Sequence, residues 1–240
     1  MRRDVQATDD WPGKARRDPS RGSSAYLVTR EITRSLQSAR DRYLQPGLRV
    51  LDVGCGVQPY YPLFAGVAAE YDGHDIEPGP RIKYVSPAES LEAPAGSYDL
   101  ILCTQVLEHV RHPQQALAEF GRVLAPGGYL FLTTHGVYPF HPHPADYWRW
   151  TQQGFEALFE DAADLELVEL VPHGGSAAAL AVMVNTPIRE ASKALRADFL
   201  GAPLIALVNT LADAVDRALP ARAKAALIPN FLAVARRRVR

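Results

Sequence analysis

The residue types best suited to chemistry are concentrated in residues 135–150, which read HGVYPFHPHPADYWRW. This stretch holds three of the chain's seven histidines, so a proton acceptor is available near neutral pH. His141, His143 and Asp146 can each take a proton from a hydroxyl group. Arg149 offers a planar guanidinium group to a carboxylate or a phosphate. We therefore predict that the stretch forms an acceptor pocket containing a general base.

The aromatic side chains of the same stretch have two interpretations. Tyr147, Trp148 and Trp150 supply flat apolar faces on which an acceptor can stack. In the structural alternative, the two tryptophans fasten the loop to the following helix, and Arg149 pairs with Asp146. We expect no bound metal, because the alternating histidines lack the carboxylates that would complete a ligand set.

A further histidine, His109, lies in a turn that reads EHV after another apolar run. It is a candidate to face the reacting group, and the alternative is a histidine that only stabilises the turn. We include it among the catalytic candidates.

The glycine-rich turn within residues 50–60, VLDVGCGVQPY, is a second candidate site. Gly54 and Gly56 allow the backbone to bend sharply and to approach a ligand closely. Asp75 ends the next apolar run, where a carboxylate in a doubly wound sheet binds the hydroxyls of a ribose. A proline replaces the third glycine of a dinucleotide fingerprint, and Asp52 suits a cationic, amino-acid-like group better than a pyrophosphate. These features favour S-adenosylmethionine (SAM) over NAD.

Alternating strands and helices must position these residues. Apolar runs predict strands at 48–54, 70–76, 98–104, 129–135, 165–171 and 230–237, and periodicity predicts helices at 24–44, from Pro113 and after Thr151. This alternation predicts an open, mostly parallel α/β sheet in one domain over residues 23–240. Residues 1–22 are polar and carry both charge signs, so we expect a disordered arm there.

Composition limits the class of protein. With 240 residues, 47% of them hydrophobic and 22% charged, the chain is long enough for one well-buried domain. The net charge of −1 provides no field that would attract nucleic acid, so we expect no nucleic-acid partner. The start of the chain does not resemble a signal peptide, and Cys55 and Cys103 suit a reducing cytosol. We expect a cytoplasmic protein, with peripheral membrane contact as the alternative.

Residues 174–228 form an unusually long connection between the last two predicted strands. Leu200, Leu204, Val208, Leu211 and Val215 fall on one helical face, which predicts an amphipathic helical insertion. The alternatives are a lid, a homodimer face, a membrane-surface contact through residues 195–219, or packing on the protein's own sheet.

Four motifs in order resemble those of class I SAM-dependent methyltransferases, the type 11 branch in particular. They read VLDVGCG, YDGHDIEP, SYDLILCTQVLEHV and VLAPGGYLFLTT, and the resemblance covers about residues 48–171. It implies a doubly wound, Rossmann-like sheet of seven strands whose last strand is antiparallel. It also implies an enzyme that transfers a methyl group from SAM.

The resemblance implies a cofactor site made largely of the motif residues. The contacts implied are Gly54, Cys55 and Gly56 under the methionine part of SAM, Asp52 near its ammonium group, Asp75 on the ribose, Ile76 on the adenine and Gln105 on the methionine side. The sequence departs from the family near the adenine amine, where Ser86 or Glu89 would replace the usual acidic residue.

Two short motifs bear on the identity of the acceptor. DYWRWT at 146–151 and PY at 59–60 are similar to a branch of these enzymes in glycan and lipopolysaccharide pathways. That similarity implies a small acceptor, or one linked to a saccharide or lipid, and we expect methylation at oxygen. One rival is a non-catalytic methyltransferase-like module that only binds a partner. The other is an NAD-dependent sugar-nucleotide oxidoreductase, but the sequence lacks the Tyr-x-x-x-Lys pair of its short-chain form.

Overall fold

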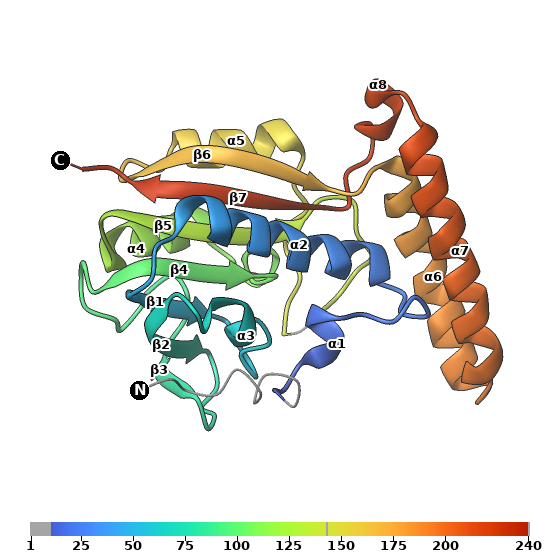
Figure 1. Cartoon of the computed structure of the whole chain (residues 1–240), viewed down its shortest axis with the longest axis horizontal. Helices are drawn as coiled ribbons and strands as arrows, with labels where there is room; N and C mark the ends of the chain where they lie inside the picture. Colours follow the sequence, from blue (N-terminus) through green and yellow to red (C-terminus); the bar gives the residue numbers. More distant parts are fainter. Residues whose placement is uncertain (1–10, 143, 240) are drawn as a thin grey trace.

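The apolar runs predicted as strands pair into a single seven-stranded sheet with helices on both faces (Figure 1). The computed structural model describes residues 11–142 and 144–239. The elements are, in order, α1 (Lys14–Arg17), α2 (Tyr26–Tyr43), β1 (Leu48–Val53), α3 (Tyr61–Phe64), β2 (Ala68–Asp75), β3 (Ile82–Val85), β4 (Tyr98–Thr104), the 3₁₀ helix η2 (Leu107–His109), α4 (Pro113–Val123), β5 (Leu124–His135), α5 (Gln152–Glu160), β6 (Leu165–His173), α6 (Ser176–Ala194), α7 (Asp198–Ala218), α8 (Ala221–Lys224) and β7 (Asn230–Arg237).

The strand order is β3-β2-β1-β4-β5-β7-β6. Strands β1 to β5 pair in parallel, whereas β7 lies antiparallel between β5 and β6. This topology confirms the predicted doubly wound, Rossmann-like sheet with a last antiparallel strand. Strand β3 is an addition to the predicted strands, because its four residues, IKYV, are too few for the alternation to stand out.

Two apolar cores cover the two faces of the sheet, and β4 contributes to both. Ile101 and Cys103 face the core beneath α4 and α5, whereas Leu100 and Leu102 face the core beneath α2. All four side chains are fully buried, as the continuous apolar run predicts. The carboxyl ends of the parallel strands therefore meet at one edge, between the two helical layers.

Two helix starts follow the sequence signals. Helix α4 begins at Pro113, and Thr151 caps α5 by accepting a hydrogen bond from the Gly154 N–H at 3.1 Å. Strand β5 begins earlier than predicted, because Leu124 already pairs with Tyr98 of β4.

Residues 11–22, part of the predicted disordered arm, are instead ordered over the glycine-rich turn. Trp11 donates its indole N–H to the carbonyl of Gln58 at 2.8 Å, and Arg17 donates to the carbonyl of Pro59 at 2.6 Å. The structure thus differs from the expected disorder over these residues, because a few hydrogen bonds anchor a polar segment. The residues before Trp11 lie outside the described part of the chain.

The predicted insertion at 174–228 forms α6, α7 and α8. Helices α6 and α7 make an antiparallel hairpin at the end of the sheet toward which β4 points (Figure 1). Asp216 of α7 accepts a hydrogen bond from the Ala177 N–H at the start of α6 at 2.9 Å, and Asn185 donates to Asn209 at 2.9 Å. These contacts join the two helices into one unit.

Candidate active site

A cavity of about 730 Å³ lies at the carboxyl edge of the sheet. The glycine-rich turn, the end of β2 and the segment after β3 line it with Gly54, Gly56, Asp75, Ile76 and Glu89. Segments beyond β4 and β5 and helix α6 line it with His109, His135, Tyr138, His141, Pro144 and Arg189. The two candidate sites of the sequence therefore share one cavity.

The glycine-rich turn depends on the two glycines. Gly54 has φ 64°, and a Cβ atom there would lie 2.3 Å from the side chain of Val106. Gly56 has φ 53° and open space beside it, so the backbone is bare at this point. The carboxylate of Asp75 accepts hydrogen bonds from the N–H groups of Gly56 and Ile76, both at 2.8 Å. Its remaining lone pairs suit further donors such as the hydroxyls of a ribose.

Asp52, the predicted partner of a cationic group, lies buried behind the turn and does not line the cavity. The hydroxyl of Tyr71 donates to Oδ2 at 2.8 Å, while Oδ1 has no hydrogen-bond partner among the described residues. Burial raises the pKa of Asp52 to about 7, against the opposing effects of the Tyr71 hydrogen bond and the charge of Arg16. An incompletely satisfied carboxyl group beside the turn fits a ligand that carries an ammonium group.

The remaining predicted cofactor residues fall into two groups. Ile76, Glu89 and Gln105 line the cavity, and Ile76 is 51% exposed, so its apolar surface is available to a ligand. Cys55 is buried, and the Ser86 hydroxyl contacts a buried histidine at 3.1 Å. Neither lines the cavity. Of the two residues predicted near the adenine amine, only Glu89 reaches the site.

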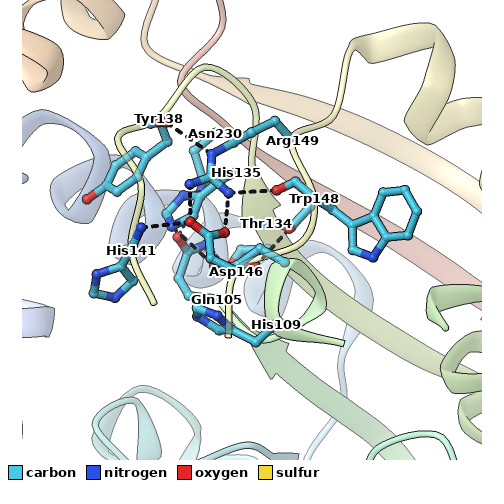
Figure 2. Close-up of polar contacts among 12 residues, drawn as sticks. Gln105, His109, Thr134, His135, Tyr138, His141, Asp146, Trp148, Arg149 and Asn230 are labelled. Atoms are coloured by element: carbon cyan, nitrogen blue, oxygen red, sulfur yellow. Dashed lines mark hydrogen bonds and ion pairs between the residues drawn. The ribbon is translucent and has the colours of Figure 1, made fainter. Parts of the chain in front are cut away.

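A chain of buried polar groups lies behind the cavity (Figure 2). Asn230, at the start of β7, donates to Oε1 of Gln105 at 3.0 Å and to Nδ1 of His135 at 3.2 Å, and it accepts from Nδ1 of His173 at 2.9 Å. Burial lowers the pKa of His135 well below its ordinary value, so this ring is neutral and carries its proton on Nε2. That nitrogen lies 3.2 Å from Oε1 of Glu108, whose pKa burial raises to about 7. Gln105 and His135 are thereby held in one orientation.

His109 has the geometry of a general base. Its Nδ1 is hydrogen-bonded to the carbonyl of Ala145, which fixes the proton on Nδ1 and leaves the Nε2 lone pair as the basic site. The ring lines the cavity, and its centroid lies 5.8 Å from that of His141. Two histidine rings therefore lie close together in the part of the cavity where the sequence predicts the acceptor.

Asp146 and Arg149, predicted as a base and an anion-binding group, pair with each other instead (Figure 2). The two guanidinium nitrogens lie 2.5 and 2.6 Å from the two carboxylate oxygens, and Arg149 also donates to the carbonyls of Tyr138 and Pro139. The hydrogen bonds from Arg149 lower the pKa of Asp146 to about 2, so this carboxylate is a weak base at neutral pH. The pair holds the loop, as in the structural alternative, and the roles of Asp146 as a base and Arg149 as an anion-binding group stay predictions.

The tryptophans of the loop also serve packing. The rings of Trp148 and Trp150 stack at 5.6 Å, and Trp150 lies 5.6 Å from Phe155 of α5. The indole N–H of Trp148 donates to the carbonyl of Val110 at 2.8 Å. Neither tryptophan lines the cavity, and Tyr147 does not line it either. The structural alternative therefore describes them, and the predicted stacking role is corrected.

Other residues of the same stretch form the acceptor wall. Tyr138 stacks on His135 with ring centroids 3.7 Å apart, and both line the cavity. His141 lines it as well, and its backbone N–H donates to Asp146 at 2.7 Å. His143, the other predicted base, lies outside the described residues.

The sequence interpretation misses several polar residues that line the cavity, among them Arg16 on α1, Thr29 on α2 and Arg189 on α6. No local motif marks them, because each reaches the site only through the packing of a segment far from the strand ends. The polar chain of Asn230, His173 and Glu108 is missed for the same reason. In the described part of the chain, no cluster of three His, Cys, Asp or Glu side chains is placed to hold a metal ion.

Residues 25–166, more than half of the chain, match a family described as a methyltransferase domain. A ubiquinone biosynthesis O-methyltransferase of Burkholderia thailandensis is 30% identical over 158 residues, which cover 52% of this chain and 67% of that relative. A ubiquinone biosynthesis O-methyltransferase of Thiobacillus denitrificans is 34% identical over 103 residues. The match covers 37% of this chain and 44% of that relative. A solved SAM-dependent methyltransferase from Mesorhizobium loti has the same fold, with a TM-score of 0.55, 16% identity, and coverage of 88% of this chain and 100% of the other.

Proposed function

The chain belongs to the class I SAM-dependent methyltransferases, and on that premise we propose that it transfers the methyl group of SAM to a hydroxyl oxygen of a small, saccharide-linked or lipid-linked acceptor. The observation that carries the proposal is the single cavity that joins the glycine-rich turn and Asp75 to His109. The O-methyltransferase names of the two relatives support oxygen as the atom that is methylated.

The end of the cavity at the glycine-rich turn offers candidate contacts for the ribose, the adenine and the methionine part of SAM. Of the residues that line the cavity, Asp75 would accept hydrogen bonds from the ribose hydroxyls, Ile76 would offer apolar surface to the adenine, and Glu89 would accept from its amine. Arg16 lines the cavity and would suit the carboxylate group of the methionine part, whereas Asp52 lies behind the turn and would act on the ammonium group only from a distance. When bound, SAM supplies a methyl group that its sulfonium charge has already activated.

The catalytic task left to the protein is to align the acceptor, exclude water and take one proton. Nε2 of His109 takes the proton from the acceptor hydroxyl, because the carbonyl of Ala145 already fixes the other ring nitrogen as a donor. Such a base contributes about 10²- to 10⁴-fold to the rate. The loop held by the Asp146–Arg149 pair forms a rigid wall beside it.

The acceptor end of the cavity has both apolar and charged surface. Val28 and Ile32 of α2 and the ring of Tyr138 are apolar, and Arg189 adds a positive charge. This combination supports an acceptor with a polar, hydroxyl-bearing head and an apolar part. A lipid-linked saccharide has that composition.

Methyl transfer from isotope-labelled SAM into the lipid and polar fractions of a cell extract tests the proposal. The expected product carries one added methyl group on a hydroxyl oxygen, identified by mass spectrometry and NMR. We expect His109→Ala to lower turnover about 10²- to 10³-fold and to change the affinity for S-adenosylhomocysteine less than about two-fold.

His112→Ala, which alters an exposed histidine near the same turn, is the matched control and should retain turnover. Methylation at nitrogen or carbon, or full turnover of His109→Ala, would contradict the assignment. Cofactor binding without methyl transfer to any fraction would favour the non-catalytic binding module.

A further inference from the structure

Helix α7 carries an uncharged apolar stripe on the side turned away from the protein. Leu200, Leu204, Leu207, Leu211 and Val215 recur at helical spacing and are between 47% and 63% exposed. Among the described helices, α7 is the one long and apolar enough to cross a membrane, yet only 22% of its most apolar window is buried. The helix is therefore no core helix, and its apolar side faces solvent.

The other side of α7 shows that the helix lies against the protein. Asn209 donates to the carbonyls of Arg21 and Ser23 at 2.8 and 3.0 Å, and Asp213 pairs with Arg30 of α2 at 2.9 Å. A membrane-spanning arrangement would separate these polar groups from their partners at high cost. The structure fits a helix that lies flat, with its polar side on the protein and the stripe outward.

Helix α6 carries exposed apolar side chains as well. Leu180, Met183 and Val184 are all exposed, and Leu195 and Phe199 continue the apolar character around the α6–α7 turn. Ten of the eighteen large hydrophobic side chains exposed in the described residues lie between positions 180 and 215, so the apolar surface is concentrated on this hairpin.

Cations border the apolar surface at both ends of the hairpin. Lys193 and Arg196 lie at the α6–α7 turn, and Arg222 and Lys224 lie on α8 beyond the other end; all four are exposed. Of the four acidic residues of α6–α8, Asp213 and Asp216 are used inside the protein, in the Arg30 pair and at the start of α6. Glu190 and Asp198 are exposed near the α6–α7 turn, where Arg189, Lys193 and Arg196 outnumber them by one positive charge. An apolar surface with cationic borders is complementary to an anionic lipid bilayer. A second copy fits less well, because two-fold pairing of this face would set cationic ends against each other.

The hairpin also lies beside the active cavity. A smaller cavity of about 250 Å³ separates residues 22–24 from α6 and α7. Ser23 and Arg189 line both cavities, so the two spaces adjoin. A bilayer bound to the hairpin would therefore lie close to the acceptor end of the site.

We propose that the α6–α7 hairpin is a docking surface for an anionic lipid bilayer, which brings the active cavity to acceptors held in that bilayer. The docking part of the proposal rests only on the exposed apolar surface and the charges around it. The supply of the acceptor from lipid rests, in addition, on the proposed function.

Co-sedimentation of the full chain with lipid vesicles tests the docking without any methyl transfer. We expect binding to vesicles of phosphatidylcholine mixed with phosphatidylglycerol, and weaker binding to phosphatidylcholine alone. Leu207→Glu/Leu211→Glu should lower partitioning into the mixed vesicles at least about ten-fold. Lys193→Ala/Arg196→Ala should lower it about five-fold for each cation removed.

Val168→Glu/Val239→Glu is the matched control, because it makes the same charge change at exposed apolar residues outside the hairpin, on β6 and just beyond β7, and should alter partitioning less than about two-fold. Circular dichroism and S-adenosylhomocysteine binding confirm that each variant is folded. Absence of vesicle binding, or equal loss in the stripe variant and the control, would overturn the proposal. So would a lipid-free dimer that Leu207→Glu/Leu211→Glu converts to a monomer, because a second copy would then cover the surface.

Discussion

The glycine-rich turn and the loop at residues 135–150 border one cavity, yet they hold their carboxylates by different means. Asp75 ends a parallel strand and receives two backbone N–H groups. Asp146 receives two guanidinium nitrogens of Arg149 and the backbone N–H of His141. The first carboxylate keeps capacity for a ligand, whereas the second is occupied by its own loop.

The difference follows from where the backbone finds its hydrogen bonds. At a strand end, the sheet has already paired the main chain, so a side chain can serve a ligand. The loop has no such ladder, and Arg149 donates to the carbonyls of Tyr138 and Pro139 that a strand neighbour would otherwise satisfy. Charged residues in an irregular loop are therefore weaker evidence of catalysis than the same residues at strand ends.

The largest effect is expected from removing the arginine of the loop. Arg149→Met should lower the free energy of unfolding by about 3 kcal/mol, because it leaves the Asp146 side chain, which is 2% exposed, without its charged partner. Urea unfolding measures the change, and Arg111→Met, at an exposed arginine, should stay within about 0.5 kcal/mol of the wild type. An unchanged stability combined with lost turnover would show that Arg149 binds the acceptor, and that it does not only hold the loop.

Removing the carboxylate of the strand end should affect binding instead. Asp75→Ala should weaken binding of S-adenosylhomocysteine about 100-fold, because two charge-assisted hydrogen bonds to the ribose are lost. Calorimetric titration measures it, with Glu77→Ala, an exposed acid two residues further on, as the control. Retained affinity in Asp75→Ala would remove the cofactor assignment.

A smaller, pH-dependent effect is expected at Asp52, a carboxyl group of the sheet whose pKa is raised mainly by burial. Its pKa is about 7 in the folded protein, above the ordinary value of 3.8, so folded chains retain a proton that unfolded chains lose as the pH rises. The stability of the wild type relative to Asp52→Asn should therefore fall between pH 4 and pH 7, by roughly 2 kcal/mol from pH 5 to pH 7, and change little above it.

Urea unfolding of both proteins across this pH range measures the difference. Subtracting the variant removes the opposing contribution of the buried His135 and His173, whose pKa values burial lowers. A difference that rises with pH would show that the Tyr71 hydrogen bond and the charge of Arg16 stabilise the Asp52 carboxylate more than burial destabilises it.

The sheet and the cofactor end could be predicted because their signals are local and ordered along the chain. Gly54 and Gly56 follow one strand and Asp75 ends the next, and both strands are indicated by apolar runs in the sequence. The shell behind the site could not be predicted, since Asn230 lies 125 residues from its partner Gln105 and nothing near either residue specifies the other. Trp11 and Arg17 are a similar case, because a polar segment became ordered through two distant carbonyls.

The position of β7 has a consequence for biosynthesis. This strand lies between β5 and β6, yet the ribosome must add the whole α6–α8 segment before it makes β7. Until then, two strands present unpaired edges and the core lacks the Phe231 side chain, so a nascent chain is exposed to aggregation. Cellular yield of this protein should therefore depend on how quickly its final strand emerges, and on chaperones that shield the open sheet in the interval.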